Sequence, residues 1–221
     1  MFSILRSNRR LFSTLLVAES RHGHLHPGNR SALAAAQKLG KPIDVLVLDS
    51  EVAAVPLKAE HVQSIFAAKH ASFKDPTADV FSHAVNAFIH SQKKYTHVVT
   101  MTSNWSKDFF PRVAAVNDCQ PVTDVIEIVN DTTYNRPIYA GNAITTVKSP
   151  GPLHFLSVRT TSFDPITKTE SGEATSIDAA GLLKGLPQNV AIWVEDKLKK
   201  SERPELGLAK IVVSGGRGSQ T

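Results

Sequence analysis

Short apolar runs alternate along this chain with stretches of helical periodicity, and this alternation limits the fold more than any other feature. Residues 43–48 (IDVLVL) form a nearly continuous apolar run, which is typical of a strand in a sheet covered on both faces. Residues 15–18 and 97–101 predict two further strands. Strands that alternate with helices form parallel sheets with right-handed crossovers. The first half therefore predicts an α/β fold, with a mostly parallel sheet flanked by helices.

Three helices are predicted between these strands. Residues 31–39 are rich in Ala and end before Gly40, which suits a helix C-cap, and residues 22–29 before them are read as a loop. Asp75 and Pro76 form an N-cap and first-turn pair ahead of residues 80–89, whose apolar positions recur at helical spacing. Residues 109–116 predict a further helix despite Pro111.

From about Asp124 onward the helical periodicity disappears. Short strand-like runs, separated by Asn, Asp, Gly and Pro, take its place at residues 125–129, 136–140, 143–148 and 154–159. Their spacing predicts antiparallel strands in the second half. Residues 160–176 are rich in Thr, Ser, Glu and Gly and predict a long exposed loop, whereas residues 191–200 predict a helix.

The basic charge of the chain is concentrated at its start. The formal net charge is +5, and Arg6, Arg9 and Arg10 lie in an acid-free segment that interleaves arginines with apolar residues. This pattern predicts a mitochondrial transit peptide over residues 1–13, cut between about Arg9 and Thr14. Subtracting these three arginines leaves about +2, so the charge does not indicate nucleic-acid binding. No run approaches the roughly 18 apolar residues of a spanning helix, so we expect no membrane insertion.

Several local runs carry a resemblance to a known family. They are residues 16–19 (LVAE), 110–115 (FPRVAA), 138–143 (IYAGNA), 157–159 with 162–163, and 203–206 leading into 212–218 (VVSGGRG). In this order and approximate spacing, essentially the whole chain after the predicted transit peptide resembles the alpha subunits of mitochondrial electron transfer flavoproteins.

The resemblance implies one subunit of a heterodimeric electron carrier, and not an enzyme. In that family an N-terminal α/β domain of the alpha subunit precedes a C-terminal domain that holds FAD, and the partner beta subunit holds AMP. Electrons from acyl-CoA dehydrogenases and other dehydrogenases of the mitochondrial matrix pass through the FAD to a membrane-bound electron transfer flavoprotein-ubiquinone oxidoreductase. Residues 14–205 match the N-terminal domain of the family.

The Gly-rich run near the end of the chain resembles the start of the family's flavin domain. Residues 206–221 are interpreted as its first strand, at 210–213, and its Gly-rich turn. Ser214, Gly215, Gly216 and Gly218 would let backbone N–H groups approach a phosphate, and the resemblance implies that Arg217 contacts FAD. The family's flavin domain continues beyond this run, so we expect residues 1–221 alone not to retain FAD. Whether Thr221 is a genuine end, a gene split or an incomplete gene model stays open.

Two other functions stay open as alternatives to an electron-carrier subunit. One is a flavin-less scaffold or assembly subunit, and the other is a stand-alone nucleotide-binding module of the same fold class. A nucleotide module needs a Gly-rich phosphate loop after an early strand, and residues 22–29 lack its spacing. His22, His24 and His26 in this segment are read as a solvated loop and not as metal ligands.

The other noticeable residues are interpreted as structural and not as catalytic. Cys119 is the single cysteine and lacks an obvious activating base, so we expect no catalytic thiol, and no other catalytic residue is assigned. Glu195 and Asp196 are expected on the solvated face of a helix. Trp105, Phe109 and Phe110 are expected in the core. For Arg112, a structural ion pair and a partner-facing role both stay open.

Overall fold

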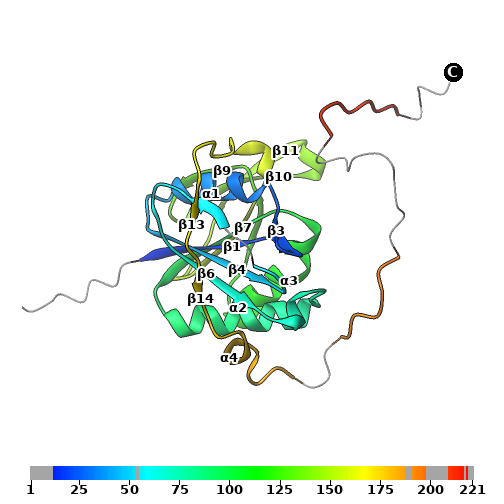
Figure 1. Cartoon of the computed structure of the whole chain (residues 1–221). Coiled ribbons are helices and arrows are strands. Elements are labelled where there is room, and N and C mark those ends of the chain that lie inside the picture. The colour runs from blue at the N-terminus through cyan, green and yellow to red at the C-terminus, as the bar shows by residue number, and fades with distance from the viewer. Residues whose placement is uncertain (1–11, 53–54, 188–190, 198–208, 217, 219–221) are drawn as a thin grey trace, which may run out of the picture.

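The computed structural model of the chain describes residues 12–52, 55–187, 191–197, 209–216 and 218. Its centre is a parallel sheet of seven strands (Figure 1). From edge to edge the order is β14 (Thr175–Ser176), β6 (Val62–Lys69), β4 (Ile43–Asp49), β1 (Ser13–Ala18), β7 (Tyr95–Met101), β12 (His154–Val158) and β8 (Val122–Val125). The predicted mostly parallel α/β sheet is confirmed.

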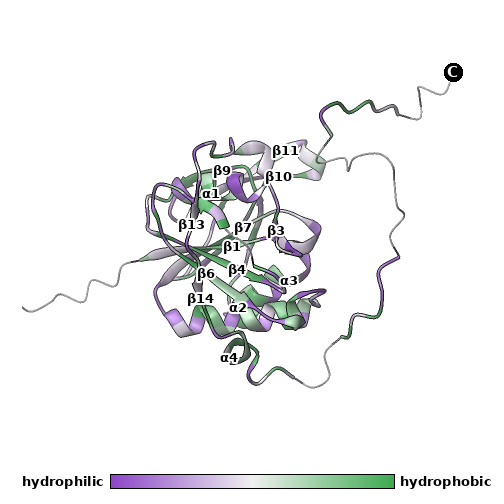
Figure 2. Ribbon diagram, viewed as in Figure 1, coloured by the Kyte–Doolittle hydropathy of each residue, from purple (hydrophilic) through white to green (hydrophobic). Residues whose placement is uncertain are grey.

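Apolar layers cover both faces of this sheet, which explains the continuous apolar runs of the inner strands. Along β1, Leu16 packs with the cluster that contains α1 (Asn29–Gln37), whereas Leu15 packs with the cluster that contains α2 (Ala78–Gln92) and α3 (Asn104–Val116). The short helix α4 (Ala179–Leu183) lies against α2. Figure 2 shows the apolar strands enclosed between these layers.

Three small antiparallel sheets complete the fold. The largest joins β11 (Ala143–Lys148), β10 (Thr133–Ile138) and β9 (Glu127–Asn130), and its Tyr134 is fully buried on the α1 side. The other two pair β13 (Glu170–Gly172) with β5 (Val55–Lys58), and β2 (Ser20–Arg21) with β3 (His24–Leu25). Short 3-10 turns occur at η1 (Ala71–Phe73), η2 (Tyr139–Gly141) and η3 (Thr160–Ser162). The predicted antiparallel strands of the second half are therefore present in β9–β11.

The strand predicted at 154–159 was assigned the wrong pairing, and the strand β8 was not predicted. Both β8 and β12 join the parallel sheet, and β12 runs parallel to β7 and to β8. Because strand partners are distant in sequence, local spacing did not reveal this arrangement. The sequence analysis also missed β5 and β6 altogether. In β6, polar Gln63 and Ser64 interrupt the apolar run that marks the neighbouring strands.

The loop predicted for residues 160–176 is wrong in part. This segment contains β13 and β14, and its Phe163 is buried in the α1-side core. Gly172 permits the close approach, because a Cβ atom there would collide with the side chain of Ile65. The segment therefore crosses the α1 side and ends as the edge strand β14 beside β6.

Several predicted element boundaries also need correction. The helix predicted behind Asp75 and Pro76 begins later, with Thr77 as its N-cap residue. The helix predicted at residues 31–39 begins at Asn29 and ends at Gln37, and the preceding loop contains β3. The helix expected at 191–200 is absent, since residues 191–197 are irregular and exposed and 198–200 lie outside the described residues. No helix among the described residues combines the length and the apolar character needed to cross a membrane.

Candidate functional site

The order of the parallel strands singles out one place at the carboxyl end of the sheet. From β1 the chain adds β4 and β6 on one side, and then β7, β8 and β12 on the other, with β12 between β7 and β8. Parallel sheets of this kind bind ligands outside the carboxyl ends of their strands, where the strand order reverses. Here that place lies between β1 and β7, next to Glu19 and Ser103. We therefore build the candidate site from the residues that follow these two strands.

Asn29 fixes the connection that leaves β1. The Glu19 N–H donates to Asn29 Oδ1 at 2.9 Å, and Asn29 Nδ2 donates to the Glu19 carbonyl at 2.8 Å. Asn29 is fully buried and satisfies the Glu19 N–H, whereas the Glu19 carbonyl also accepts from the His26 N–H at 3.0 Å. Sequence analysis had placed Asn29 in a loop. The pattern of Asn at the start of an Ala-rich helix was the available signal.

Ser103 ties the same connection to the next helix. Its hydroxyl donates to Glu19 Oε2 at 2.6 Å. It also accepts from the Ser106 N–H at 3.1 Å, while the Ser103 N–H donates to Ser106 Oγ at 2.9 Å. This reciprocal pair is a capping box, and it starts α3 where β7 ends. The carboxyl ends of β1 and β7 are thus held together by side chains.

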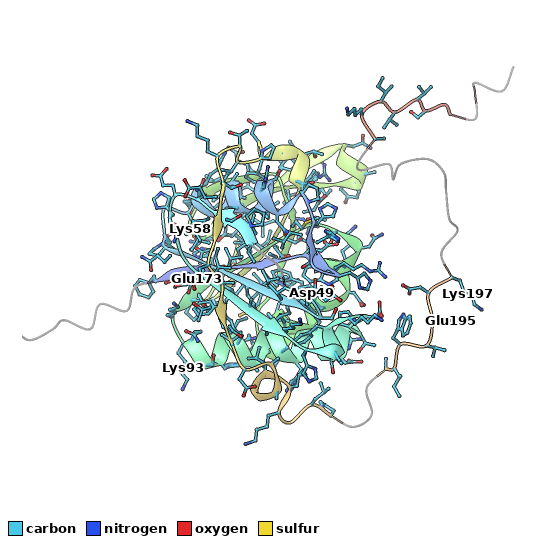
Figure 3. The ribbon with its side chains drawn as sticks, in the orientation of Figure 1. Asp49, Lys58, Lys93, Glu173, Glu195 and Lys197 are labelled. Atoms are coloured by element: carbon cyan, nitrogen blue, oxygen red, sulfur yellow. The ribbon has the colours of Figure 1, made fainter. Side chains whose placement is uncertain are left out.

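Asp49 holds the small hairpin β2–β3 over the end of β4. This carboxylate is fully buried, and it accepts from Ser20 Oγ at 2.5 Å and from the Gly23 N–H at 3.0 Å. Gly23 has a φ of 79°, which glycine adopts without strain. An acidic residue directly after the buried run 43–48 was a sequence signal that we had not used. Figure 3 labels Asp49 inside the molecule, next to the strand ends.

The backbone N–H groups at the start of α1 already have hydrogen-bond partners within the chain. A Cβ atom on Gly28, its N-cap residue, would lie 2.9 Å from Thr160 Cγ2 and 3.1 Å from Met101 Cε. The Gly28 N–H already donates to His26 Nδ1 at 3.0 Å. In nucleotide sites of this fold class, the phosphate approaches this helix N-terminus. Here the N–H groups that would receive a phosphate are already hydrogen-bonded within the chain.

A cavity of about 280 Å³ lies beside the strand ends. It is lined by Glu19, Arg21, Asp75, Trp105, Trp193 and Asp196, among others. Two indole rings supply apolar walls, and the charged groups of both signs stand at its rim. The volume lies slightly below the roughly 300–1,000 Å³ typical of sites for small molecules. The cavity therefore suits a small group or a side chain, and not a large cofactor.

Asp196 is the residue whose sequence interpretation changes most. We expected it on the solvated face of a helix, but the segment is irregular and the Asp196 carboxylate accepts from Trp193 Nε1 at 3.0 Å and from Arg21 Nη2 at 2.7 Å. The indole hydrogen bond and then the charge of Arg21 lower the pKa of Asp196. Because Arg21 lies 175 positions away along the chain, no local pattern predicted this contact.

The Gly-rich run predicted to meet FAD is exposed in the part of it that the structure describes. Residues 210–213 were expected to form a strand, but their backbone is irregular, and no described strand pairs with them. A strand requires such a partner for its hydrogen bonds. Val213 is 93% exposed, and Ser214, Gly215 and Gly216 are exposed as well. Gly218 is also exposed, and Arg217 lies outside the described residues.

Arg112 forms an ion pair with Asp79, which links α3 to the first turn of α2. Of the two roles left open for Arg112, the structure shows the ion pair. Phe109 and Phe110 are buried as expected, and Trp105 packs against the same cluster, with its ring 4.8 Å from that of Phe81.

The remaining candidates do not join a site. Cys119 is partly buried, and burial raises its pKa, which disfavours the reactive thiolate. His22, His24 and His26 lie in and beside the hairpin β2–β3. Within the part of the chain that the structure describes, no three His, Cys, Asp or Glu residues are placed to hold a metal ion.

A second polar cluster, missed by sequence analysis, lies at the amino end of the sheet. His97 is 1% exposed, and its Nε2 lies 2.7 Å from the Asp131 carbonyl oxygen. A carbonyl only accepts, so we assign the proton to Nε2, and Nδ1 then accepts from the Thr96 hydroxyl at 2.9 Å. The His154 ring is 4.9 Å away. Burial, and then the charge of nearby Lys41, lower the pKa of His97 to about 4.

Comparison with known proteins adds a family assignment to this geometry. The model of a family described as "Electron transfer flavoprotein domain" matches residues 14–182. "Electron transfer flavoprotein subunit alpha" of Pseudomonas aeruginosa is 37% identical over 209 residues, which are 93% of this chain and 65% of that protein. "Electron transfer flavoprotein subunit alpha, mitochondrial" of Oryza sativa subsp. indica is 36% identical over 230 residues, covering 98% of this chain and 63% of the relative. The protein of the same name in Dictyostelium discoideum is 35% identical over 226 residues, covering 96% of this chain and 63% of the relative. The chain thus spans a little less than two thirds of the length of these curated relatives.

Proposed function

Because this chain belongs to the electron transfer flavoprotein family, we propose that it serves as the alpha subunit of an electron carrier rather than as an enzyme. One observation carries the proposal. The family match covers residues 14–182, which include the central sheet except for its first residue, Ser13, and the helices α1, α2 and α3. The resemblance is therefore one of the complete folded domain and not of an isolated motif.

The proposed electron path begins at acyl-CoA dehydrogenases and other dehydrogenases of the mitochondrial matrix. It passes through FAD to a membrane-bound electron transfer flavoprotein-ubiquinone oxidoreductase. Two observations support a mitochondrial location: the names of the Oryza and Dictyostelium relatives, and the acid-free arginine-rich residues 1–13. We propose that this segment is a transit peptide that directs the chain to the matrix.

The proposed partner is a beta subunit, as the name "subunit alpha" of the relatives suggests. Within this heterodimer we assign AMP to the beta subunit. The N–H groups at the first turn of α1 support that assignment, since they already have hydrogen-bond partners within the chain and would have to give them up to bind a phosphate. The same geometry disfavours a stand-alone nucleotide-binding module.

FAD, which the family implies, does not fit the cavity at the carboxyl end of the sheet. The molecule joins an isoalloxazine ring to an adenosine through a ribityl chain and a pyrophosphate, whereas that cavity measures about 280 Å³. A flavin site buries most of the cofactor in a concave pocket. We therefore expect residues 1–221 to purify without colour, and a stoichiometric flavin spectrum would contradict this expectation.

We propose that residues 14–205 form the N-terminal domain and that residues 206–221 begin the flavin domain. In the whole protein, the backbone at Ser214, Gly215, Gly216 and Gly218 would lie against FAD, and Arg217 would pair with its negative charge. The resemblance of this run to the family supports the assignment, and its exposure in the structure is compatible with a missing binding partner.

Co-expression with the family's beta subunit tests the carrier function. We expect a one-to-one complex, because permanent interfaces of this kind bury upwards of about 2,000 Å². The flavin domain of a relative, fused after Thr221, should then yield a yellow complex that an acyl-CoA dehydrogenase reduces in the presence of its substrate. A monomer that ignores the beta subunit, or a flavin that the dehydrogenase never reduces, would count against the proposal.

Import into isolated mitochondria tests the transit peptide separately. Replacing Arg6, Arg9 and Arg10 by Glu should stop import, because the segment then loses its positive charge. Import that proceeds unchanged would refute the targeting assignment and leave the carrier assignment untouched.

A further inference from the structure

The segment 191–197 returns to the carboxyl end of the sheet after α4. Its Ala191 N–H lies 3.4 Å from Asp79 Oδ2, in the first turn of α2. Two residues later, Trp193 lines the cavity beside β1 and β7. The segment therefore connects the start of α2 with the place where the strand order reverses.

Arg21 links this segment to the domain. Its Nη2 lies 2.7 Å from Asp196 Oδ2 and 3.9 Å from Asp75 Oδ1. The second oxygen of Asp196 accepts from Trp193 Nε1 at 3.0 Å. One carboxylate thus orients both the indole and the guanidinium, while the hairpin that carries Arg21 is itself held by buried Asp49.

Charge and exposure distinguish the two faces of this segment. Glu195 and Lys197 pair with each other at 3.0 Å, and their side chains are 61% and 83% exposed. Figure 3 shows both on the outer part of the segment. Trp193 and Asp196 instead line the cavity, opposite Trp105 and Glu19. The segment presents one indole and one carboxylate to the domain, and its other charges to solvent.

We propose that the surface beside the cavity at the carboxyl end of the sheet is a docking site for this chain's own residues Trp193 and Asp196, which close one side of the cavity, with Arg21 as the residue that retains them. The place where related topologies hold a ligand is then enclosed on one side by the segment that leads from the domain toward the Gly-rich run. This inference goes beyond the electron-carrier function and does not depend on it.

The contacts make the docking reversible. The side chains of Arg21 and Asp196 are 60% and 37% exposed, and exposed ion pairs contribute little and are weakened by salt. Docking also limits how far the residues after Lys197 reach from the domain, because a shorter free chain confines its end to a smaller volume. The docked and released segments therefore place the following part of the chain differently.

Limited trypsin digestion of the full chain, followed at the bond after Lys197, tests the role of Arg21. Arg21→Gln should raise the cleavage rate about two- to five-fold, the range expected for loss of one exposed ion pair. Arg30→Gln is the matched control, since Arg30 is exposed on α1, and it should leave the rate unchanged. Neither change alters the residues around the scissile bond.

Fluorescence of Trp193 tests the role of Asp196. The chain has two tryptophans, so Trp105→Phe leaves Trp193 as the only indole while keeping an aromatic ring against Phe81. In this background, Asp196→Asn should increase acrylamide quenching of Trp193 by up to about two-fold. Trp193 is 46% exposed when it is docked, and release would expose the rest of its surface. The neighbouring change Glu195→Gln should have no effect. Combining Arg21→Gln with Asp196→Asn should add little to either single change.

Three results would overturn the proposal. They are cleavage after Lys197 that Arg21→Gln does not accelerate, quenching of Trp193 that Asp196→Asn does not change, and equal effects of the Glu195→Gln control. Circular dichroism of each variant separates release of the segment from unfolding of the domain. About 1 M salt should bring the parent chain close to the variants, as expected for a screened ion pair.

Discussion

The two ends of the central sheet are stabilised by different kinds of polar group. At the carboxyl end, Asn29, Asp49 and Ser103 bind backbone or side-chain groups of the connections that leave the strands. At the amino end, buried Asp44 meets Lys94 at 2.5 Å, and buried His97 lies beside Lys41. The cavity lies at the carboxyl end. The polar groups at the carboxyl end thus position the connections beside the cavity, whereas Asp44 and His97 at the amino end are buried in the core.

The directions of the helices explain at which end of the sheet the charged residues of the helix termini lie. In a parallel α/β fold, helices start at the carboxyl ends of strands and finish near the amino ends. Asp79 accordingly lies in the first turn of α2, whereas Lys38 and Lys93 are the C-cap residues of α1 and α2. Each sign complements the partial charge of the adjacent helix end. Side chains at the two ends should therefore differ in how their loss affects stability, pH dependence and docking.

Asn29→Ala should produce the largest effect, at the carboxyl end. The change leaves the Glu19 N–H without its buried partner, which costs about 1–3 kcal/mol, and it removes one of two hydrogen bonds to the Glu19 carbonyl, which still accepts from the His26 N–H. We expect the free energy of unfolding to fall by up to about 4 kcal/mol in urea titrations. Gln37→Ala on the same helix removes a surface contact to the Glu60 carbonyl and should cost less than about 1 kcal/mol. Equal losses for the two variants would show that Asn29 does not hold this connection.

Acid should destabilise the amino end selectively through His97. Its pKa falls from an ordinary value of 6.5 to about 4 in the folded chain. Between these values the unfolded chain binds a proton that the folded chain does not, so stability is complete above about pH 6.5 and declines as the pH falls toward 4. The expected loss is about 3 kcal/mol, because each pKa unit corresponds to about 1.4 kcal/mol.

Chemical denaturation at pH 7, 5.5 and 4 measures this decline. His97→Gln removes the titrating ring, so its stability should depend less steeply on pH in this window, although it is lower at pH 7. His61→Gln is the control, since His61 is a half-exposed histidine outside the cluster. Parallel pH profiles for the parent chain and His97→Gln would contradict the assignment of a neutral buried ring.

The sequence predicted those parts of the fold whose signal is local. The strands β1, β4 and β7 have continuous apolar runs because both faces of the sheet are covered, and α2 has a clear helical period. The pairing of β8 and β12 was not predicted, since their partners are remote in sequence. The strand β6 was missed because Gln63 and Ser64 interrupt its apolar pattern.

The polar sites were predicted less well because they are assembled from distant segments. His97 was read only as part of a strand, and its cluster needs Lys41 and Asp131 from two other segments. Asp196 needs Arg21, which a local pattern does not reveal. The family resemblance, by contrast, rests on ordered local runs, and it was confirmed over residues 14–182. The family resemblance therefore predicted the fold, whereas the contacts between residues far apart in the sequence became known only from the structure.

Tyr95→Phe should give a moderate effect, confined to the amino end. The Tyr95 hydroxyl donates to Asp44 Oδ2 at 2.9 Å, and the Asp44 side chain is 2% exposed. Phe keeps the ring stacked on Phe88 and removes only this hydrogen bond to a charged group, which costs about 1.5–3 kcal/mol. Because Lys94 still pairs with Asp44, we expect the lower value in thermal unfolding. Trypsin cleavage after Lys197 should stay unchanged, and an accelerated cleavage would show that the two ends of the sheet are coupled.

Ser103→Ala should give the smallest effect on stability, although it lies at the end where the segment docks. Loss of the N-cap of α3 costs about 1 kcal/mol, and the exposed part of Glu19 can replace the lost contact with water. Glu19 lines the cavity, so the variant frees its carboxylate to move toward Trp193 and Asp196. Like charges repel, and Asp196 should then dock less well. In the Trp105→Phe background, we therefore expect Ser103→Ala to increase quenching of Trp193 while shifting the melting temperature by only a few degrees. Ser103→Thr keeps the hydroxyl and should restore the parent quenching. If Ser103→Ala and Tyr95→Phe changed quenching equally, the difference between the two ends of the sheet would be one of stability alone.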